Sequence, residues 1–244
     1  MLPWIKTAAD FPSVSRALVS PNGLLCAGGN LAEETIIAAY CSGIYPWYSQ
    51  GQPILWWSPD PRMVLRPADL RITKSLAKTM RQGKFEITFD AAFEQVMHAC
   101  AAPRTDDGGT WIVPEMIAAY TRLHERGAAH SVEAWVKDGG AEDGRNTLVG
   151  GLYGVALGNV FFGESMFSRR TDASKVAFAT LMEKLKADGF ALIDCQQETQ
   201  HLASFGAAPI ARTIFAQRLR QSIDVEQARL PGGKCSAWRA EGHE

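Results

Sequence analysis

The pattern of apolar and polar positions after residue 62 follows two alternating periods. Short apolar or strictly alternating runs predict strands, and stretches with apolar residues three and four positions apart predict helices between them. The runs that predict strands are 63–65, 85–89, 129–136, 148–157, the run that begins at 160, and 190–196. The stretches that predict helices begin at or just after Thr73, Asp90, Pro114, Ala173, Glu198 and Thr213. This order predicts an α/β fold, in which Val160 to Gln196 forms a strand–helix–strand unit.

Residues that favour helix starts support several of these boundaries. Thr73 and Asp90 are suitable N-caps, and a proline such as Pro114 suits the first turn of a helix. Nearer the N-terminus, Asn30 and Glu33 have the spacing of a capping box. This spacing predicts one further helix before residue 62.

Three polar segments predict irregular structure. Residues 104–109 and 137–146 are rich in glycine and charge, which is typical of surface loops. Beyond Val225 the chain contains glycine, proline and charged residues, and we expect it to fray.

The first 62 residues differ from the rest, and a domain boundary is predicted there. Residues 44–62 contain four prolines and three tryptophans, which predicts a stiff, aromatic, non-helical segment. For any one tryptophan, packing in a small core is the favoured interpretation. Three tryptophans close together leave a second interpretation open, a platform on which nucleic-acid bases stack. We expect a small domain over 1–62 and a larger one over 63–244.

Two carboxylates lie in apolar surroundings. Glu164 is surrounded by phenylalanines and a methionine, and Asp194 follows two apolar residues of a predicted strand. A carboxylate is costly to bury unless it is paired or takes part in chemistry. Gly158-Asn159 is typical of a two-residue hairpin turn, so the strand carrying Glu164 should pair with 148–157. The two acids therefore predict a functional site.

An amide accompanies the second acid. Regular strand alternation places Asp194 and Gln196 on one face and Cys195 on the other, so we expect Asp194 to hold or polarise the amide of Gln196. Two carboxylates and an amide suit proton transfer or the binding of an amine. They do not suit covalent catalysis, which needs a nucleophile beside a base.

Other catalytic patterns are weaker. A thiol–imidazole pair of Cys195 and His201 is disfavoured, because a single cysteine with apolar neighbours is usually inert packing. Ser75 and Lys78 match an SxxK pattern whose partner motifs are missing. Glycine-rich phosphate loops are missing as well.

Composition narrows the classes of protein. Hydrophobic residues make up 46% and charged residues 21% of the chain, which is ordinary for a soluble globular protein. Neither a membrane span nor a signal peptide is recognisable, so we expect no membrane association. The five cysteines are odd in number, scattered and without zinc-like spacing, which favours the cytoplasm and no metal. Because the net charge is −1, any nucleic-acid contact needs a local basic patch.

One predicted helix carries such a patch. Lys74, Lys78 and Arg81 fall at i, i+4 and i+7, with Arg71 before them and Lys84 after them. A solvated helix face is the ordinary explanation. A surface that contacts phosphates is the alternative.

Eight strings of residues together resemble a known family. They are PNGLL (21–25), YPW (45–47), LWWSPDPR (55–62), GTWI (109–112), HSVE (130–133), GGLYGV (150–155), FGESMFS (162–168) and LIDCQ (192–196). Their order and type are similar to those of leucyl/phenylalanyl-tRNA–protein transferases, over nearly the whole chain to about Arg220. The loop 137–146 and the C-terminal tail depart from the family pattern.

This resemblance implies a function and a fold. The family transfers Leu or Phe, and sometimes Met, from aminoacyl-tRNA to the α-amine of proteins that begin with Arg or Lys, which marks those proteins for degradation. The implied fold is a small N-terminal domain followed by an acetyltransferase-like (GNAT-like) domain. No cofactor is implied, and we expect a cytoplasmic monomer.

The resemblance also implies roles for particular residues. It assigns catalysis to Asp194, Gln196 and Glu164. The implied amino-acid pocket is Leu152, Phe161, Met166, Phe178 and Leu181. The implied contacts to the terminal adenosine of tRNA are Trp47 and Trp111, with Tyr40 and Tyr120 nearby. The implied contacts to the tRNA backbone are Arg71, Lys74, Lys78, Arg81 and Lys84.

Three alternatives stay open. A CoA-dependent N-acetyltransferase would share the implied fold, although the pyrophosphate-binding loop of such enzymes is missing. A tRNA-dependent aminoacyltransferase of peptidoglycan precursors would prefer other aminoacyl groups. A non-catalytic RNA-binding module would explain the aromatic residues and the basic face, but not the two acids and the amide beside an apolar pocket.

Overall fold

Two mixed β-sheets organise the part of the chain that the computed structural model describes, residues 1–102, 110–137, 146–229 and 236–238. The smaller sheet has the order β1-β2-β4-β3, with β1 and β2 parallel and the other pairs antiparallel. Its strands are Trp4–Ile5 (β1), Leu24–Gly28 (β2), Tyr45–Pro46 (β3) and Leu55–Trp57 (β4). The mixed α/β class expected from the sequence is confirmed.

The larger sheet has the order β11-β5-β10-β9-β8-β7-β6. Its strands are Arg62–Leu65 (β5), Glu86–Phe89 (β6), Ala129–Lys137 (β7), Asn146–Leu157 (β8), Val160–Ser168 (β9), Leu192–Gln196 (β10) and Ala208–Ile210 (β11). The predicted hairpin at Gly158-Asn159 is confirmed, since Leu157 pairs with Val160. The predicted strand–helix–strand unit is also confirmed, because β9 and β10 are parallel.

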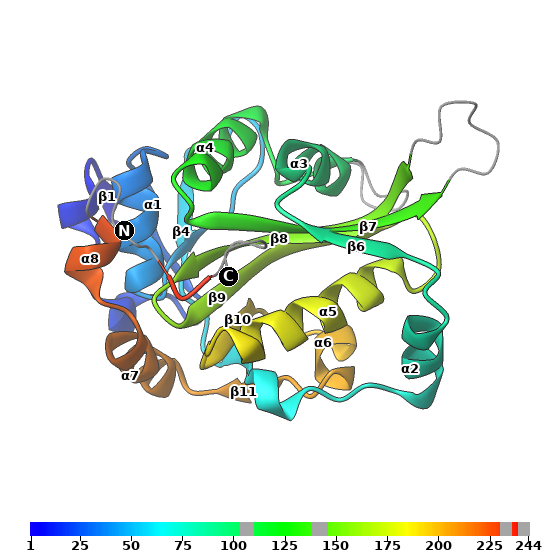
Figure 1. Ribbon diagram of the computed structural model, residues 1–244. Helices are drawn as coiled ribbons and strands as arrows, with labels where there is room; N and C mark the ends of the chain where they lie inside the picture. The colour runs from blue at the N-terminus through cyan, green and yellow to red at the C-terminus, as the bar shows by residue number, and fades with distance from the viewer. Residues whose placement is uncertain (103–109, 138–145, 230–235, 239–244) are drawn as a thin grey trace.

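Helices cover both faces of the larger sheet (Figure 1). Helices α3 (Phe93–Ala101) and α4 (Pro114–Glu125) lie on one face, and α5 (Ala173–Ala187) lies on the other. The remaining helices are Glu33–Cys41 (α1), Lys74–Arg81 (α2), Gln200–Ser204 (α6), Arg212–Ser222 (α7) and Val225–Arg229 (α8). Each face therefore has its own apolar cluster, one centred on α1, α3 and α4 and one centred on α5.

Most predicted helix starts agree with the structure, but Asp90 does not. Thr73 caps α2 by accepting a hydrogen bond from the backbone of Leu76, and Pro114 opens α4. Asp90 has a left-handed φ of 58° and lies outside α3, whose N-cap is Ala92. Its carboxylate instead accepts hydrogen bonds from His130 and the backbone of Ser131.

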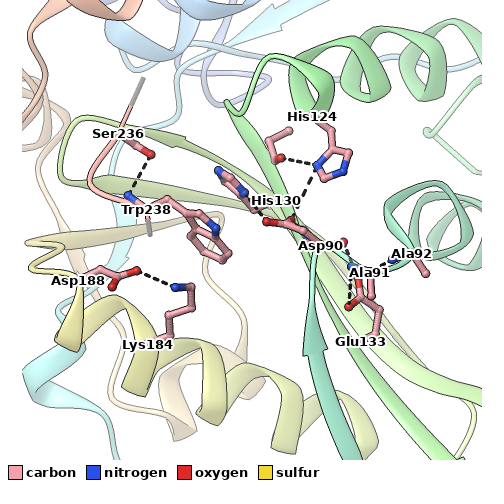
Figure 2. Close-up of polar contacts among 12 residues, drawn as sticks. Asp90, Ala91, Ala92, His124, His130, Glu133, Lys184, Asp188, Ser236 and Trp238 are labelled. Atoms are coloured by element: carbon pink, nitrogen blue, oxygen red, sulfur yellow. Dashed lines mark hydrogen bonds and ion pairs between the residues drawn. The ribbon is translucent and has the colours of Figure 1, made fainter. Parts of the chain in front are cut away.

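Glu133 of β7 holds the residues that precede α3. Its carboxylate accepts hydrogen bonds from the backbone N–H groups of Ala91 and Ala92 (Figure 2). It also accepts hydrogen bonds from the hydroxyls of Thr88 and Ser131. A contact supplied by a distant strand leaves no local signal in the sequence. The start of α1 also differs from the expected capping box. Asn30 lies two residues before the N-cap Ala32 and accepts a hydrogen bond from the Ala32 backbone.

The C-terminal part is more ordered than expected. Residues 225–229 form α8, and residues 236–238 pack against the larger sheet, so the prediction that the chain frays after Val225 was wrong for these residues. Strand β11 was not predicted at all. The predicted loop at 104–109 lies outside the described residues, as does 138–145 of the predicted loop 137–146. The ends of that loop, Lys137 and Asn146, belong to β7 and β8.

Packing explains two of the three clustered tryptophans. Trp56 is fully buried and Trp57 nearly so, and both belong to the apolar clusters. Trp47 is 38% exposed. A stacking platform of all three rings is therefore not present. The division into domains at residue 62 stays a prediction, since one apolar cluster contains residues from both sides of it, including Tyr40 and Tyr120.

Candidate active site

One cavity of about 440 Å³ brings together the residues that the sequence singled out. All five predicted pocket residues line it, and so do Glu164, Asp194, Gln196, Trp47 and Trp111. Further lining residues that the sequence did not indicate include Tyr45, Tyr153, Gln197, Thr199 and Leu202. The five pocket residues, which form an apolar cup, and the polar trio Glu164, Asp194 and Gln196 therefore converge on one space. Its lining includes residues of β3, β8, β9, β10, α5 and α6.

Two β-bulges set the direction of the polar side chains at the cavity. On β9, Ser165 pairs with Tyr153 and Gly163 pairs with Gly154, which leaves Glu164 as the extra residue of a bulge. On β10 the register against β5 shifts between Asp194 and Gln196. A bulge redirects side chains locally and is frequent beside active sites.

The second bulge changes the expected geometry of β10. Gln196 has a φ of 59°, in the left-handed region that a residue with a side chain rarely adopts. The bulge ends the regular alternation of side chains at Asp194. The expectation that Asp194 and Gln196 lie on one face assumed this alternation, and that assumption was wrong. Backbone strain of this kind is typical of functional sites.

Glu164 is held by neutral donors. Its Oε1 accepts hydrogen bonds from Tyr40 Oη at 2.7 Å and from Gln196 Nε2 at 2.8 Å, and Tyr120 Oη lies 3.5 Å from Oε2. Burial raises the pKa of Glu164 to about 8, although the bond from Tyr40 opposes the shift. A carboxylate with such a pKa exchanges a proton near neutral pH.

Asp194 has a cationic partner instead. Arg62 donates to both of its oxygens, from Nε at 2.7 Å and from Nη2 at 2.6 Å, and both side chains are completely buried. The backbone N–H of Gln196 donates to the same carboxylate at 2.9 Å. Asp194 thus contacts Gln196 through its backbone, while the side-chain amide of Gln196 donates to Glu164.

Arg62 was missed as a site residue. Its guanidinium lies 4.8 Å from the ring centres of both Tyr45 and Phe215 and donates to the carbonyl of Gly43. Burial acts against the charge of Arg62, and the pairing with Asp194 nevertheless leaves its pKa raised. The available signal was Asp194 itself, because a buried acid requires a partner, and Arg62 is a cation at the start of the apolar strand β5.

The aromatic residues expected around an adenosine divide into two groups. Trp47 and Trp111 are partly exposed and line the cavity. Tyr40 and Tyr120 are completely buried, and their hydroxyls bond to each other and to Glu164. The two tyrosines therefore contact the acid rather than offering a ring face to the cavity.

The basic residues lie elsewhere. Arg71, Lys74, Lys78, Arg81 and Lys84 are all exposed, on or beside α2, and none of them lines the cavity. The structure thus presents them as a surface separate from the cup.

Cys195 and His201 both line the cavity, yet neither is prepared for nucleophilic chemistry. Burial raises the pKa of the Cys195 thiol, so the thiolate is disfavoured. Burial lowers the pKa of His201. Within the described ranges, no group of three His, Cys, Asp or Glu residues could hold a metal ion, and no helix is both long and apolar enough to cross a bilayer.

Comparison with known proteins identifies the family. The family model described as "Leucyl/phenylalanyl-tRNA protein transferase" matches residues 64–220, and the model of its N-terminal domain matches residues 29–60. This chain belongs to that family. A relative from Azoarcus sp. (strain BH72), called leucyl/phenylalanyl-tRNA–protein transferase, is 58% identical over 221 residues, which cover 91% of each chain. A relative of the same name from Stutzerimonas stutzeri (strain A1501) is 54% identical and covers 98% of this chain and 100% of its own.

A solved structure is also similar. The structure described as "Crystal structure of FemX" is 9% identical, with a TM-score of 0.48, and the match covers 74% of this chain and 69% of that one. This likeness is too weak to support a conclusion. Membership of the family rests on the sequence matches.

Proposed function

We propose that this protein transfers Leu or Phe, and also Met, from aminoacyl-tRNA to the α-amine of proteins that begin with Arg or Lys. Family membership supports the proposal. The observation that carries it is the convergence of an apolar cup and a carboxylate of raised pKa on one cavity. The proposal includes action as a monomer in the cytoplasm, on proteins that the new residue marks for degradation.

In this reaction the amine nitrogen attacks the carbonyl carbon of the aminoacyl ester. An amide bond forms, the ester C–O bond to the terminal ribose breaks, and the ribose oxygen gains a proton as it leaves. The ester is already activated, so no covalent enzyme intermediate is required. The protein's tasks are to position the two reactants and to take up the proton of the amine.

Glu164 is the group we assign to proton uptake. An α-amine has a pKa of roughly 7.7–8.0, and burial raises the pKa of Glu164 to about 8. A general base is most effective when its pKa is close to the pKa of the group it deprotonates and to the working pH. Gln196 then acts as a positioning group, because its amide donates to Glu164 while its oxygen can accept a hydrogen bond from the incoming amine.

Asp194 acts indirectly in this scheme. Its carboxylate binds the backbone of Gln196 and is neutralised by Arg62, so the pair fixes the bulge from which Gln196 projects. Tyr40 and Tyr120 hold Glu164 from the other side. In place of the expectation that Asp194 holds or polarises the side-chain amide of Gln196, Asp194 thus positions Gln196 through its backbone.

The tRNA substrate is bound by the remaining groups. The aminoacyl side chain occupies the cup, which separates similar side chains by only about 1–3 kcal/mol per methylene. The terminal adenosine stacks between Trp47 and Trp111, each stacked base contributing about 1–3 kcal/mol without regard to sequence. The basic surface of α2 contacts the phosphates of the acceptor stem.

A transfer assay tests the proposal. Labelled Phe-tRNA is supplied with a protein that begins with Arg, and with the same protein beginning with Ala. We expect label on the first protein only, and loss of that label in Glu164→Gln but not in Glu198→Gln, which changes an exposed acid outside the cavity lining. Equal labelling of both proteins, or of neither, would refute the proposal.

A further inference from the structure

Residues 236–238 pack against the large sheet beside the hairpin of β8 and β9. Ser236 forms a bridge with Gly158, and the backbone N–H of Ala237 donates to the Gly158 carbonyl at 2.9 Å. The backbone of Trp238 donates to the Ser236 hydroxyl at 3.2 Å (Figure 2). The segment is therefore anchored by its backbone, and the indole of Trp238 is directed onto the sheet.

The indole of Trp238 fills a space between the sheet and α5. The ring of His130 stacks on it at a centroid distance of 4.1 Å and an angle of 14°, and Lys184 Nζ lies 4.7 Å from its centre. Phe89 meets it edge-on at 5.9 Å. His130 is itself bonded to Asp90, and Lys184 to Asp188, so the neighbours of the indole are held in place (Figure 2).

The same indole reaches the wall of the amino-acid cup. Trp238 and Phe161 lie 6.1 Å apart, centre to centre, with their planes 23° from parallel. Phe161 lines the cavity, whereas Trp238 does not. Phe161 also packs against Gly154, where an added Cβ would lie 2.5 Å from its ring. Gly154 and Trp238 both limit where the ring of Phe161 can lie.

We propose that Trp238 is a positioning residue that sets the size of the amino-acid cup by holding Phe161 in place. This inference rests on the proposed function, because it concerns the side chain that is transferred. Trp238 lies outside residues 64–220, the part that the family model matches, so this support comes from the chain's own C-terminal tail. Removing the indole leaves room for Phe161 to withdraw from the cavity, and a larger cup favours Phe over Leu.

The ratio of kcat/KM for Phe-tRNA to that for Leu-tRNA measures this effect. A merely destabilised enzyme loses both activities together and keeps its ratio, because the amount of folded enzyme cancels. For Trp238→Ala we expect the ratio to rise by about threefold or more, since even one methylene of pocket space can change discrimination by roughly tenfold or more and the wall moves only indirectly. Trp238→Phe, which keeps an aromatic ring, should return the ratio toward that of the unaltered enzyme.

Two controls make the test decisive. Trp4→Ala removes an indole that is 67% exposed and does not line the cavity, so its ratio should not change. In a Phe161→Leu background, Trp238→Ala should shift the ratio much less, because the residue through which it acts is gone. If Trp238→Ala does not fold, Trp238→Phe and Trp238→Leu are compared by the same ratio.

The outcomes separate this inference from the proposed function. An unaltered enzyme that transfers neither residue would refute the proposed function itself. An active enzyme whose ratio is the same in every folded Trp238 variant would overturn the role of Trp238 alone. A shift of full size in the Phe161→Leu background would also overturn it, because the effect would then not pass through Phe161.

Discussion

Glu164 and Asp194 are two acids at the same cavity, and their partners make them different chemical groups. Asp194 is completely buried and paired with the guanidinium of Arg62. Glu164 is only partly buried and is bonded by neutral donors, Tyr40 and Gln196. The ion pair with Arg62 fixes the position of Asp194, which binds the backbone of Gln196, whereas burial among neutral donors raises the pKa of Glu164 to about 8. Of the two, Glu164 is therefore suited to exchange a proton with a substrate.

Breaking the buried ion pair should have the largest effect. Asp194→Ala leaves Arg62 charged and unpaired in the interior and frees the backbone of Gln196. We expect the free energy of unfolding to fall by about 3–5 kcal/mol, as measured by chemical denaturation, with loss of transfer activity.

A surface pair provides the matched control. Asp69→Ala removes a similar bidentate contact to Arg66, but both side chains are exposed. Because solvent screens an exposed pair, Asp69→Ala should lower the free energy of unfolding far less than Asp194→Ala. A loss equally small for Asp194→Ala would show that the Arg62–Asp194 pair does not hold the site together.

Removing the titratable acid should affect rate rather than stability. Glu164→Gln keeps the shape and the contacts to Tyr40 and Gln196 but cannot accept the proton. We expect the single-turnover transfer rate to fall by about 10²- to 10⁴-fold, with no loss of unfolding free energy at pH 7. A variant that transfers at the normal rate would remove Glu164 from the chemistry.

The dependence of stability on pH should reveal the titration of Glu164. The pKa of Glu164 is raised from an ordinary 4.5 to about 8, so the folded protein keeps a proton that the unfolded chain has lost. The contribution of Glu164 to stability is fully present below about pH 4.5 and is lost as the pH rises to about 8. The slope from this group is at most about 1.4 kcal/mol per pH unit, and access of solvent to the cavity reduces it.

Denaturation of Glu164→Gln across the same pH range isolates that contribution. The difference in unfolding free energy between the two proteins should grow in favour of the variant as the pH rises to about 8. A constant difference would mean that Glu164 titrates normally.

The smallest expected effect is a shift of the pH–rate profile. Tyr40 donates to Glu164 and so lowers its pKa. Tyr40→Phe should therefore move the rising limb of the single-turnover rate to higher pH, by up to about one unit. The α-amine of the substrate titrates in the same range, but it does not respond to Tyr40. Tyr48→Phe, a buried tyrosine outside the cavity lining, should leave the profile in place.

The sequence predicted helices and strands well where interactions between residues close in the chain determine the structure. The two-residue turn at Gly158-Asn159 and the amphipathic pattern of 173–187 gave the correct hairpin and helix. The cup residues converge as expected, because β8, β9 and α5 follow one another along the chain. The fold class and the family could therefore be inferred before the structure.

Contacts between distant residues could not be predicted in this way. Arg62 is 132 residues from Asp194, and Tyr40 is 124 residues from Glu164. The bulges at Glu164 and before Gln196 break the period of two on which the prediction for β10 relied. The ring neighbours of Trp238 come from several separate elements, so no local pattern in the sequence predicts its packing on the sheet. Tertiary packing decided each of these positions.

The most direct test of the account is the protonation state of Glu164 itself. Infrared difference spectroscopy against Glu164→Gln isolates the signal of its carboxyl group as the pH changes. We predict a protonated carboxyl at pH 7 that ionises with a midpoint near pH 8. A carboxyl that is already ionised at pH 7, with a midpoint near the ordinary value of about 4.3, would contradict the division of roles between the two acids.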